Sequence, residues 1–102
     1  MSVRIRAFRG KRQTSVYREQ VLPDESFDAI RDAARGLTLL PSLVPTTAPE
    51  LDKRLARRLA DEATTVRGSA KLPELDAELV ALAEVAHWCG RSREHAWLTV
   101  DQ

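Results

Sequence analysis

The chain has 102 residues, of which 43% are hydrophobic and 30% are charged, and its formal net charge is +1. This composition is ordinary for a globular protein and argues against a disordered chain, and the length predicts one compact domain over residues 1–102. The single cysteine excludes an internal disulfide framework and fits a reducing compartment. Because we find neither a membrane-length apolar run nor a secretory signal, we expect a cytoplasmic protein without a membrane partner.

Positive charge is concentrated at the N-terminus. Residues 1–23 contain six basic side chains and one acidic side chain, which gives this segment a net charge of +5. Residues 24–102 contain ten basic and fourteen acidic side chains, a net charge of −4. Such segregation draws attention to the N-terminal segment as a surface for an anionic partner.

The first two predicted elements are strands that form a hairpin. Apolar and polar or aromatic side chains alternate over residues 3–8, which is the period of a half-buried strand. Arg9-Gly10-Lys11 predicts a turn, and residues 14–21 are rich in β-branched and aromatic side chains. We expect the hairpin to turn its apolar side chains inward and its arginines outward.

A helix is predicted next, with Asp24 as its N-cap and Arg35-Gly36 at its end. The apolar stretch that follows is interrupted by Pro41 and Pro45, so it predicts a buried connection or a short strand. Thr47-Ala48-Pro49-Glu50 has the pattern of a capping box and predicts the start of a second helix that runs to about Arg67-Gly68.

The third predicted helix runs from about Pro73-Glu74 to Cys89, with Gly90 as its cap. Apolar residues cover most of its circumference, so we expect it to be buried on two sides. It is then either the central helix of the fold or a helix that contacts another chain through its Ala77/Ala81/Trp88 face. Residues 95–100 predict a final strand, with alternate apolar side chains on one side.

These elements predict an α+β fold with the order β-β-α-α-α-β. A small antiparallel or mixed sheet, made of the N-terminal hairpin and the C-terminal strand, packs against three helices. The last strand has to pair beside one of the first two for the apolar sides of both to face the third helix.

No group of residues in the sequence predicts catalysis. His87, Cys89 and His95 are close in sequence, but their spacing matches no usual zinc site, and Cys89 lies near the C-terminal end of a helix, where the dipole disfavours a thiolate. The four glycines are isolated and form no phosphate-binding loop. We therefore expect no enzyme activity, no cofactor and no metal.

The basic hairpin is the candidate binding surface. We expect a small non-catalytic protein that binds another protein with an acidic surface, as an inhibitor, immunity-type protein, adaptor or accessory regulator does. A nucleic-acid-binding accessory protein that uses the same hairpin is the alternative, and a merely solvated strand face is the simplest interpretation. Association of two copies through the Ala77/Ala81/Trp88 face is a further expectation. The candidate binding residues are Arg4, Arg6, Phe8, Arg9, Lys11, Arg12, Tyr17 and Arg18.

Overall fold

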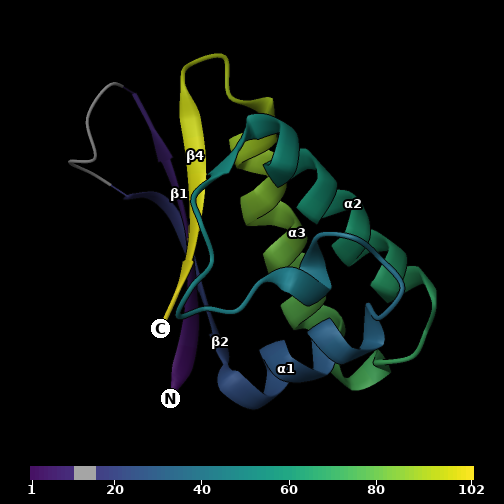
Figure 1. Ribbon diagram of the computed structural model, residues 1–102. Coiled ribbons are helices and arrows are strands. Elements are labelled where there is room, and N and C mark those ends of the chain that lie inside the picture. The colour runs from purple at the N-terminus through teal and green to yellow at the C-terminus, as the bar shows by residue number, and fades with distance from the viewer. Residues whose placement is uncertain (11–15) are drawn as a thin grey trace.

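The computed structural model describes residues 1–10 and 16–102 (Figure 1). Its strands are β1 (Ser2–Arg9), β2 (Val16–Pro23), β3 (Leu51–Asp52) and β4 (Ala96–Asp101). Its helices are α1 (Asp24–Ala33), α2 (Lys53–Gly68) and α3 (Asp76–Arg91), and two short 3-10 helices are η1 (Leu40–Ser42) and η2 (Pro73–Leu75). The predicted α+β class and the order of the main elements are confirmed, and β3 is an addition that the sequence patterns did not indicate.

The four strands form one antiparallel sheet in the order β2-β1-β4-β3. The C-terminal strand therefore pairs beside the hairpin, as predicted. Ile5 of β1 lies opposite Gln20 of β2 on one side and Val100 of β4 on the other. Because paired residues share a face, the apolar side chains of β1 and β4 point to the same side of the sheet. The buried members of that side are Val3, Ile5, Ala7, Ala96, Leu98 and Val100.

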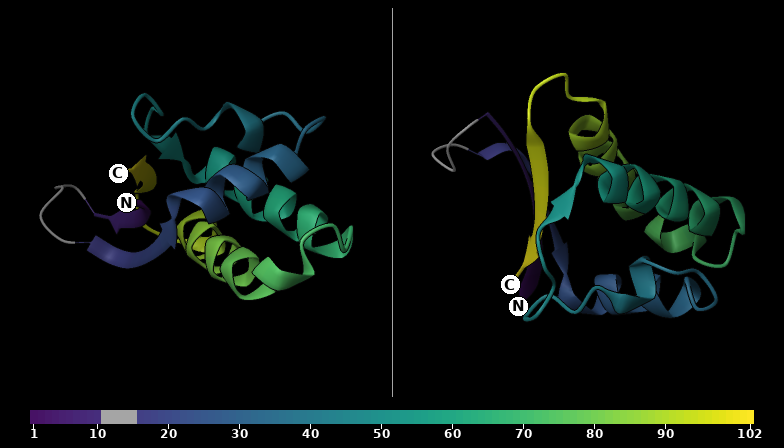
Figure 2. Two further views of the ribbon diagram at one scale, coloured as in Figure 1. Left: turned by 90° about the horizontal axis from the view of Figure 1, so that it is seen from below. Right: turned by 45° about the horizontal axis from the view of Figure 1, so that its top comes forward.

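All three helices cover one face of the sheet, and the other face carries no helix among the described residues (Figure 2). α3 lies between the sheet and α2, in contact with both. Its buried side chains include Leu79, Leu82, Ala86 and Cys89. The third helix is therefore the central one, as expected, although only part of its apolar circumference is buried, since Ala77 and Trp88 are exposed.

Gly90 lies inside α3 and is buried, so the prediction that it caps the helix is wrong. The reason is the close approach of α2. A Cβ atom on Gly90 would lie 2.5 Å from Cγ and 3.3 Å from the backbone nitrogen of Arg57. Glycine is needed here to let two helices pack closely, whereas Ser92 follows the helix in an extended conformation.

The predicted start of the second helix at the Thr47–Glu50 capping box is also wrong. α2 begins at Lys53, and the side chain of Asp52 caps it by accepting a hydrogen bond from the Leu55 N–H at 2.8 Å. Leu51 pairs with Leu98 in the sheet instead, and its side chain is buried. Burial of Leu51 against β4 therefore overrides the local helix signal.

The segment around α1 agrees with the predictions except at the first residue. α1 begins at Asp24 itself, and Pro23 occupies the N-cap position without a side-chain hydrogen bond. Gly36 has a φ of +103°, the left-handed conformation expected where the chain turns away from the helix. The connection that follows is buried as predicted, with Leu40 and Leu43 almost inaccessible to solvent.

A buried carboxylate holds that connection against α2. Glu62 is only 7% exposed, and its oxygens accept hydrogen bonds from the backbone N–H of Leu39 at 3.0 Å and of Leu40 at 2.7 Å. The Thr38 hydroxyl donates a further bond at 3.2 Å. These donors include the first N–H groups of η1, which have no partner within that short helix. Glu62 thus takes the place of a local cap, supplied by a different helix.

Candidate functional site

The hairpin residues proposed for binding do not form one surface. Arg4, Arg6 and Phe8 alternate with the buried residues of β1 and so face the helix-free side of the sheet. Arg6 forms an ion pair with Glu19 across the hairpin, with Nε 3.1 Å from Oε2. Arg4 lies opposite Asp101 of β4. Acidic neighbours therefore offset two of the cations on this face.

Arg18 faces the opposite side, which corrects the expectation that the hairpin arginines all point outward. It pairs with Ala7, whose side chain is buried under the helices. Its guanidinium carbon lies 4.2 Å from the centroid of the Trp88 ring on α3, a cation–π contact. Lys11 and Arg12 lie outside the described residues, and so does the side chain of Tyr17.

The two tryptophans have different environments. Trp97 of β4 is 8% exposed and stacks on Phe8, with ring centroids 5.4 Å apart. The ring of His95 also contacts Trp97, in a tilted arrangement with centroids 5.2 Å apart. This cluster fixes the end of β1 against β4. Trp88 is 41% exposed. Trp97 is therefore a buried anchor of the sheet, whereas Trp88 is partly accessible to solvent.

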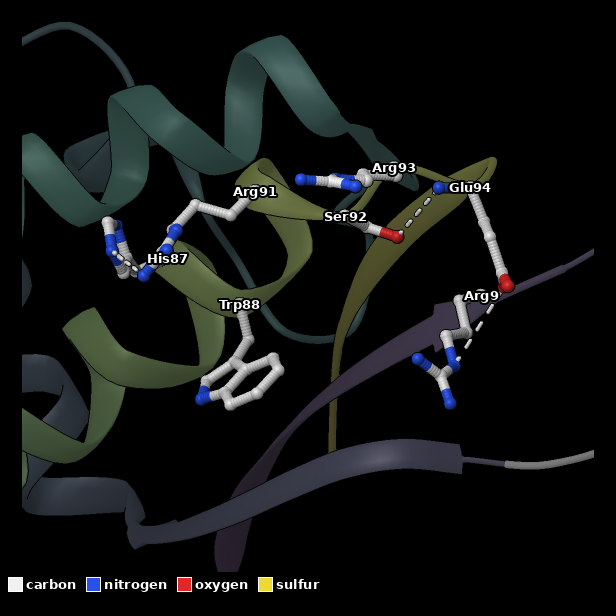
Figure 3. A pocket seen from close by; sticks show the side chains of 7 residues that line it. All are labelled: Arg9, His87, Trp88, Arg91, Ser92, Arg93 and Glu94. Atoms are coloured by element: carbon white, nitrogen blue, oxygen red, sulfur yellow. Dashed lines mark hydrogen bonds and ion pairs between the residues drawn. The ribbon is translucent and has the colours of Figure 1, made fainter.

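A cleft next to Trp88 is the best candidate for a binding site (Figure 3). It has a volume of about 330 Å³ and lies where the end of β1, the last turns of α3 and the connection to β4 meet. Its three guanidinium groups come from different parts of the chain and are accompanied by one carboxylate. The residues that line it are Arg9, His87, Trp88, Arg91, Ser92, Arg93 and Glu94.

The polar contacts inside the cleft are loose. Nε of Arg9 lies 3.9 Å from Oε2 of Glu94, and both side chains are about half exposed, at 48% and 60%. Nη1 of Arg91 lies 3.4 Å from Nε2 of His87. Because a guanidinium only donates, that imidazole nitrogen has to be the acceptor. These contacts hold the cationic groups at the rim of the cleft without neutralising all of them.

Two cations from α2 hold the end of α3 that borders the cleft. Nζ of Lys53 donates to the carbonyl oxygen of Ser92 at 3.2 Å, and Nε of Arg57 donates to that of Gly90 at 3.1 Å. Positive groups at the C-terminal carbonyls of a helix are favoured by its dipole. They also bring additional positive charge to this end of the molecule and tie the end of α3 to α2.

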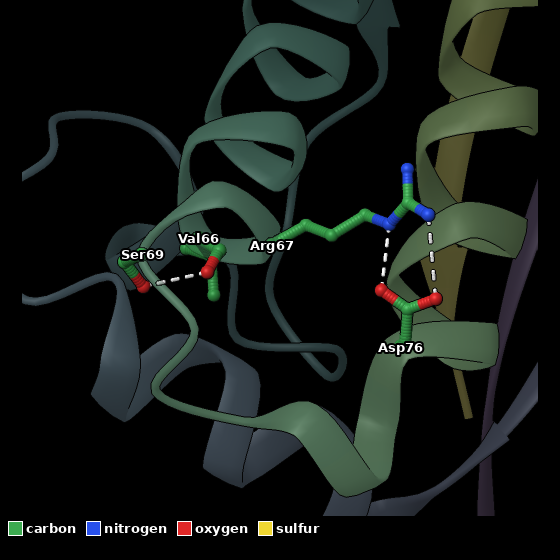
Figure 4. A network of polar contacts seen from close by, with 4 residues as sticks. All are labelled: Val66, Arg67, Ser69 and Asp76. Carbon is green, nitrogen blue, oxygen red and sulfur yellow. Dashed lines mark hydrogen bonds and ion pairs between the residues drawn. The ribbon is translucent and has the colours of Figure 1, made fainter.

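The other end of the α2–α3 pair is held by a bidentate ion pair (Figure 4). Nε of Arg67 lies 2.6 Å from Oδ1 of Asp76, and Nη2 lies 3.3 Å from Oδ2. Hydrogen bonding to Arg67 lowers the pKa of Asp76. The Ser69 hydroxyl donates to the Val66 carbonyl at 2.6 Å and so closes α2. This end is a structural connection and forms no part of the cleft.

Nothing in the cleft indicates a nucleophile or a metal centre among the described residues. Cys89 is buried behind it, and desolvation by burial raises the pKa of its thiol to about 11, with Lys53 lowering it to a smaller extent. A thiol of this kind is a poor nucleophile at neutral pH. Within residues 1–10 and 16–102, no three His, Cys, Asp or Glu side chains gather in a way that could hold a metal ion.

Most of the cleft was missed by reasoning from the sequence. Arg9 alone is shared between the predicted hairpin surface and the cleft. The signal that was available is the segment from His87 to Glu94, where two arginines closely follow a tryptophan. We interpreted that segment only as a metal or nucleophile candidate, because its proximity to β1 is a tertiary feature.

Comparisons with known proteins add no assignment: no family model, curated protein or solved structure matches the chain. In the part of the chain that the structure describes, no helix has both the length and the apolar character needed to cross a membrane.

Proposed function

We propose that the protein is a small non-catalytic binding protein that docks an acidic segment of a partner protein in the cleft between β1 and α3. The observation that carries this proposal is the convergence of Arg9, Arg91 and Arg93 beside the half-exposed Trp88 on a hollow of about 330 Å³. Arginine and tryptophan are the residues that most often dominate the binding energy of protein interfaces.

The carboxylate of Glu94 indicates how a ligand would bind. It lies 3.9 Å from the Arg9 guanidinium nitrogen, which is outside hydrogen-bonding distance. A carboxylate of the partner could approach Arg9 or Arg93 more closely and form bidentate bonds, which are shorter and stronger. Docking then blocks or recruits the partner without chemistry, as an inhibitor, immunity-type protein, adaptor or accessory regulator does. The lone, buried Cys89 supports a reducing, cytoplasmic setting.

Nucleic acid is the competing ligand, since the same cations would attract phosphates. The aromatic side chains argue for a protein partner. Arg18 covers Trp88 at 4.2 Å, and Phe8 and Trp97 stack on each other. Single-strand binders instead present open aromatic faces on which bases stack.

The experiment is a titration followed by intrinsic tryptophan fluorescence, in which the partly exposed Trp88 should respond to the ligand and the buried Trp97 should contribute a constant background. Purified protein is titrated at low ionic strength with a terminally blocked heptaglutamate peptide and, separately, with a thymidine oligonucleotide. We expect the peptide to bind and Arg93→Glu to weaken it by about tenfold or more, which corresponds to about 1.4 kcal/mol. Lys71→Glu is the matched control, because Lys71 is exposed in the α2–α3 connection and the charge change is identical.

Equal loss of peptide binding in the Arg93→Glu and Lys71→Glu variants would mean that net charge, and not the cleft, holds the peptide. If the oligonucleotide binds more tightly than the peptide, with an affinity that falls steeply with salt, the nucleic-acid function replaces the proposed one. Failure of both probes to bind would overturn the assignment of the cleft.

A further inference from the structure

We propose that the chain forms a two-fold symmetric dimer in which β2 pairs with β2 of a second copy and joins the two sheets. This proposal uses the edge of the sheet and does not depend on the function proposed for the cleft. β2 is the outermost strand in the order β2-β1-β4-β3 and is eight residues long. No element in the described part of the chain pairs with its outer edge. A long open edge of this kind is a template for another strand.

The register shows which backbone groups lie at that edge. In antiparallel strands, opposed residues alternate between pairs that exchange hydrogen bonds and pairs that do not. The N–H of Asp24 donates to the Met1 carbonyl at 3.2 Å, which continues the β1–β2 register and marks odd-numbered β1 residues as bonded to β2. The N–H of Gly10 donates to the His95 carbonyl at 2.8 Å, so even-numbered β1 residues face β4. Ile5 and its opposite residue Gln20 therefore bond to each other.

The backbone N–H and C=O groups of the residues on either side of Gln20 consequently point away from β1. Glu19 and Val21 lie opposite Arg6 and Arg4, in pairs that do not exchange bonds, and direct their N–H and C=O groups to the open edge. A two-fold axis at Gln20 places Glu19 of one copy opposite Val21 of the other, so that both residues can exchange backbone hydrogen bonds in both copies. The side chain of Val21 is 49% exposed and gains a cross-strand neighbour there.

Other registers are worse for identifiable reasons. An axis at Glu19 would place two Glu19 carboxylates directly opposite each other, and like charges in that position are destabilising. An axis at Val21 would place Glu19 opposite Pro23 of the second copy, and proline has no N–H to donate. The axis at Gln20 keeps both hydrogen bonds of each Glu19–Val21 pair. Pro23 then lies opposite residue 17 of the second copy, at the end of the pairing, where only the bond that a proline N–H would donate is missing. This axis also brings two amide side chains together on the helix side of the sheet.

The same two-fold axis places the Ala77/Ala81/Trp88 face of α3, which the sequence predicted as a possible contact with another chain, next to the same face of the second copy. Ala77, Ala81 and Trp88 share one side of α3, and the contact of Arg18 with Trp88 shows that this side lies towards β2. α3 contacts both β1 and β2. A helix above those two strands lies about 10 Å from its symmetry mate, since strands are about 4.8 Å apart. That separation suits helices with small residues at the contact.

Charge supports the antiparallel arrangement of the two α3 helices. Glu78 lies in the first turn of α3 and Arg91 lies in the last, whereas Asp76 of the first turn is already paired with Arg67. Two-fold symmetry places the acidic start of one helix beside the basic end of the other. The two α3 dipoles also oppose each other in this arrangement. Trp88, which is 41% exposed in the single chain, borders both this seam and the cleft.

Sedimentation velocity of the full chain tests the proposal. We expect a species of twice the 11.4 kDa chain mass whose population grows with concentration. Ala81→Glu places a charge in the α3 seam and should shift the dimer dissociation constant upward by at least about tenfold, or about 1.4 kcal/mol. Val80→Glu is the matched control, because Val80 is also half-buried on α3 but lies beside the α2 groove, and it should leave the dimer intact.

A second variant addresses the strand. Val21→Pro removes an N–H at the open edge and none that bonds to β1. The variant should therefore fold, as circular dichroism would show, and sediment as a monomer.

Amide hydrogen exchange tests the strand pairing without a substitution in β2. The backbone amides of Glu19 and Val21 should exchange more slowly in wild type than in Ala81→Glu at equal protein concentration. A wild type that remains monomeric up to roughly 1 mM, or a dimer that survives both variants, would refute the proposal. Arg93→Glu should leave the dimer unchanged, which separates this result from the cleft experiment.

Discussion

Glu62 offers the sharpest test of how this fold is held together, because its carboxylate replaces the missing cap of η1. Substitution by alanine leaves the backbone N–H groups of Leu39 and Leu40, which lie 3.0 and 2.7 Å from its oxygens, without an acceptor. Hydrogen bonds to charged groups contribute about 1.5–3 kcal/mol each, and an unsatisfied buried donor costs about 1–3 kcal/mol. Since the two N–H groups share one carboxylate, we expect Glu62→Ala to lower the free energy of unfolding by about 3–5 kcal/mol.

Urea denaturation followed by circular dichroism measures this loss, and Tm should fall by roughly 10–20 °C, since one kcal/mol corresponds to about 4 °C or more in a domain of this size. Glu62→Gln keeps one acceptor oxygen and should lose about half as much. Asp61→Ala is the control, because Asp61 is the exposed neighbour on α2, and it should change the free energy by less than about 0.5 kcal/mol. If Glu62→Ala behaved like Asp61→Ala, the buried carboxylate would not be the anchor of η1.

Three further predictions concern the α2–α3 pair. Since burial raises the pKa of the Cys89 thiol to about 11, this thiol should react with iodoacetamide at pH 8 roughly a hundredfold more slowly than an unperturbed thiol. Unfolding in urea should abolish the difference. Rapid labelling of the folded protein would show that the thiol is not buried. Gly90→Ala should destabilise the fold by about 1–3 kcal/mol, because the added Cβ atom would clash with Arg57. Gly68→Ala is the control: no atom lies within 4 Å of a Cβ atom added there, so this variant should be neutral or stabilising. Similar Tm values for the two variants would contradict the close contact between α2 and α3. Because the ion pair with Arg67 lowers the pKa of Asp76, Asp76→Asn should lower Tm at pH 7. The difference in Tm between wild type and variant should shrink below about pH 4 and vanish once acid protonates the carboxylate in the folded state. A difference in Tm that does not depend on pH would contradict a stabilising ion pair.

Local patterns were sufficient for most of the secondary structure. The alternation along β1 predicted which side chains are buried, and the apolar circumference of α3 predicted its central position. Both inferences rest on geometry that a single element imposes on its own side chains: a period of two in a strand and of 3.6 in a helix. The pairing of β4 with β1 followed from the need to bury both apolar strand faces under the same helix.

The errors arose where a distant contact overrides a local signal. Thr47–Glu50 resembles a helix start, yet Leu51 gains more by pairing with Leu98 in the sheet. Gly90 resembles a helix cap, yet the approach of Arg57 keeps it within α3. Glu62 occupies a buried position of α2, and only the nearby backbone of residues 39–40 explains a charge there. A carboxylate on the apolar side of a helix was the available signal for the last of these.

By itself, the sequence determined three of the four strands of the sheet, the helix face that is buried and the excess of positive charge near the N-terminus. The tertiary structure decided where that charge can act. It brought Arg9 to Arg91 and Arg93 across some eighty residues, turned Arg18 toward Trp88, and left Arg6 paired with Glu19. The physical reason is that the burial pattern of a helix or strand depends on residues close together in the sequence. A binding cleft depends instead on which ends of helices and strands lie side by side, and this is determined by the pairing register of the strands.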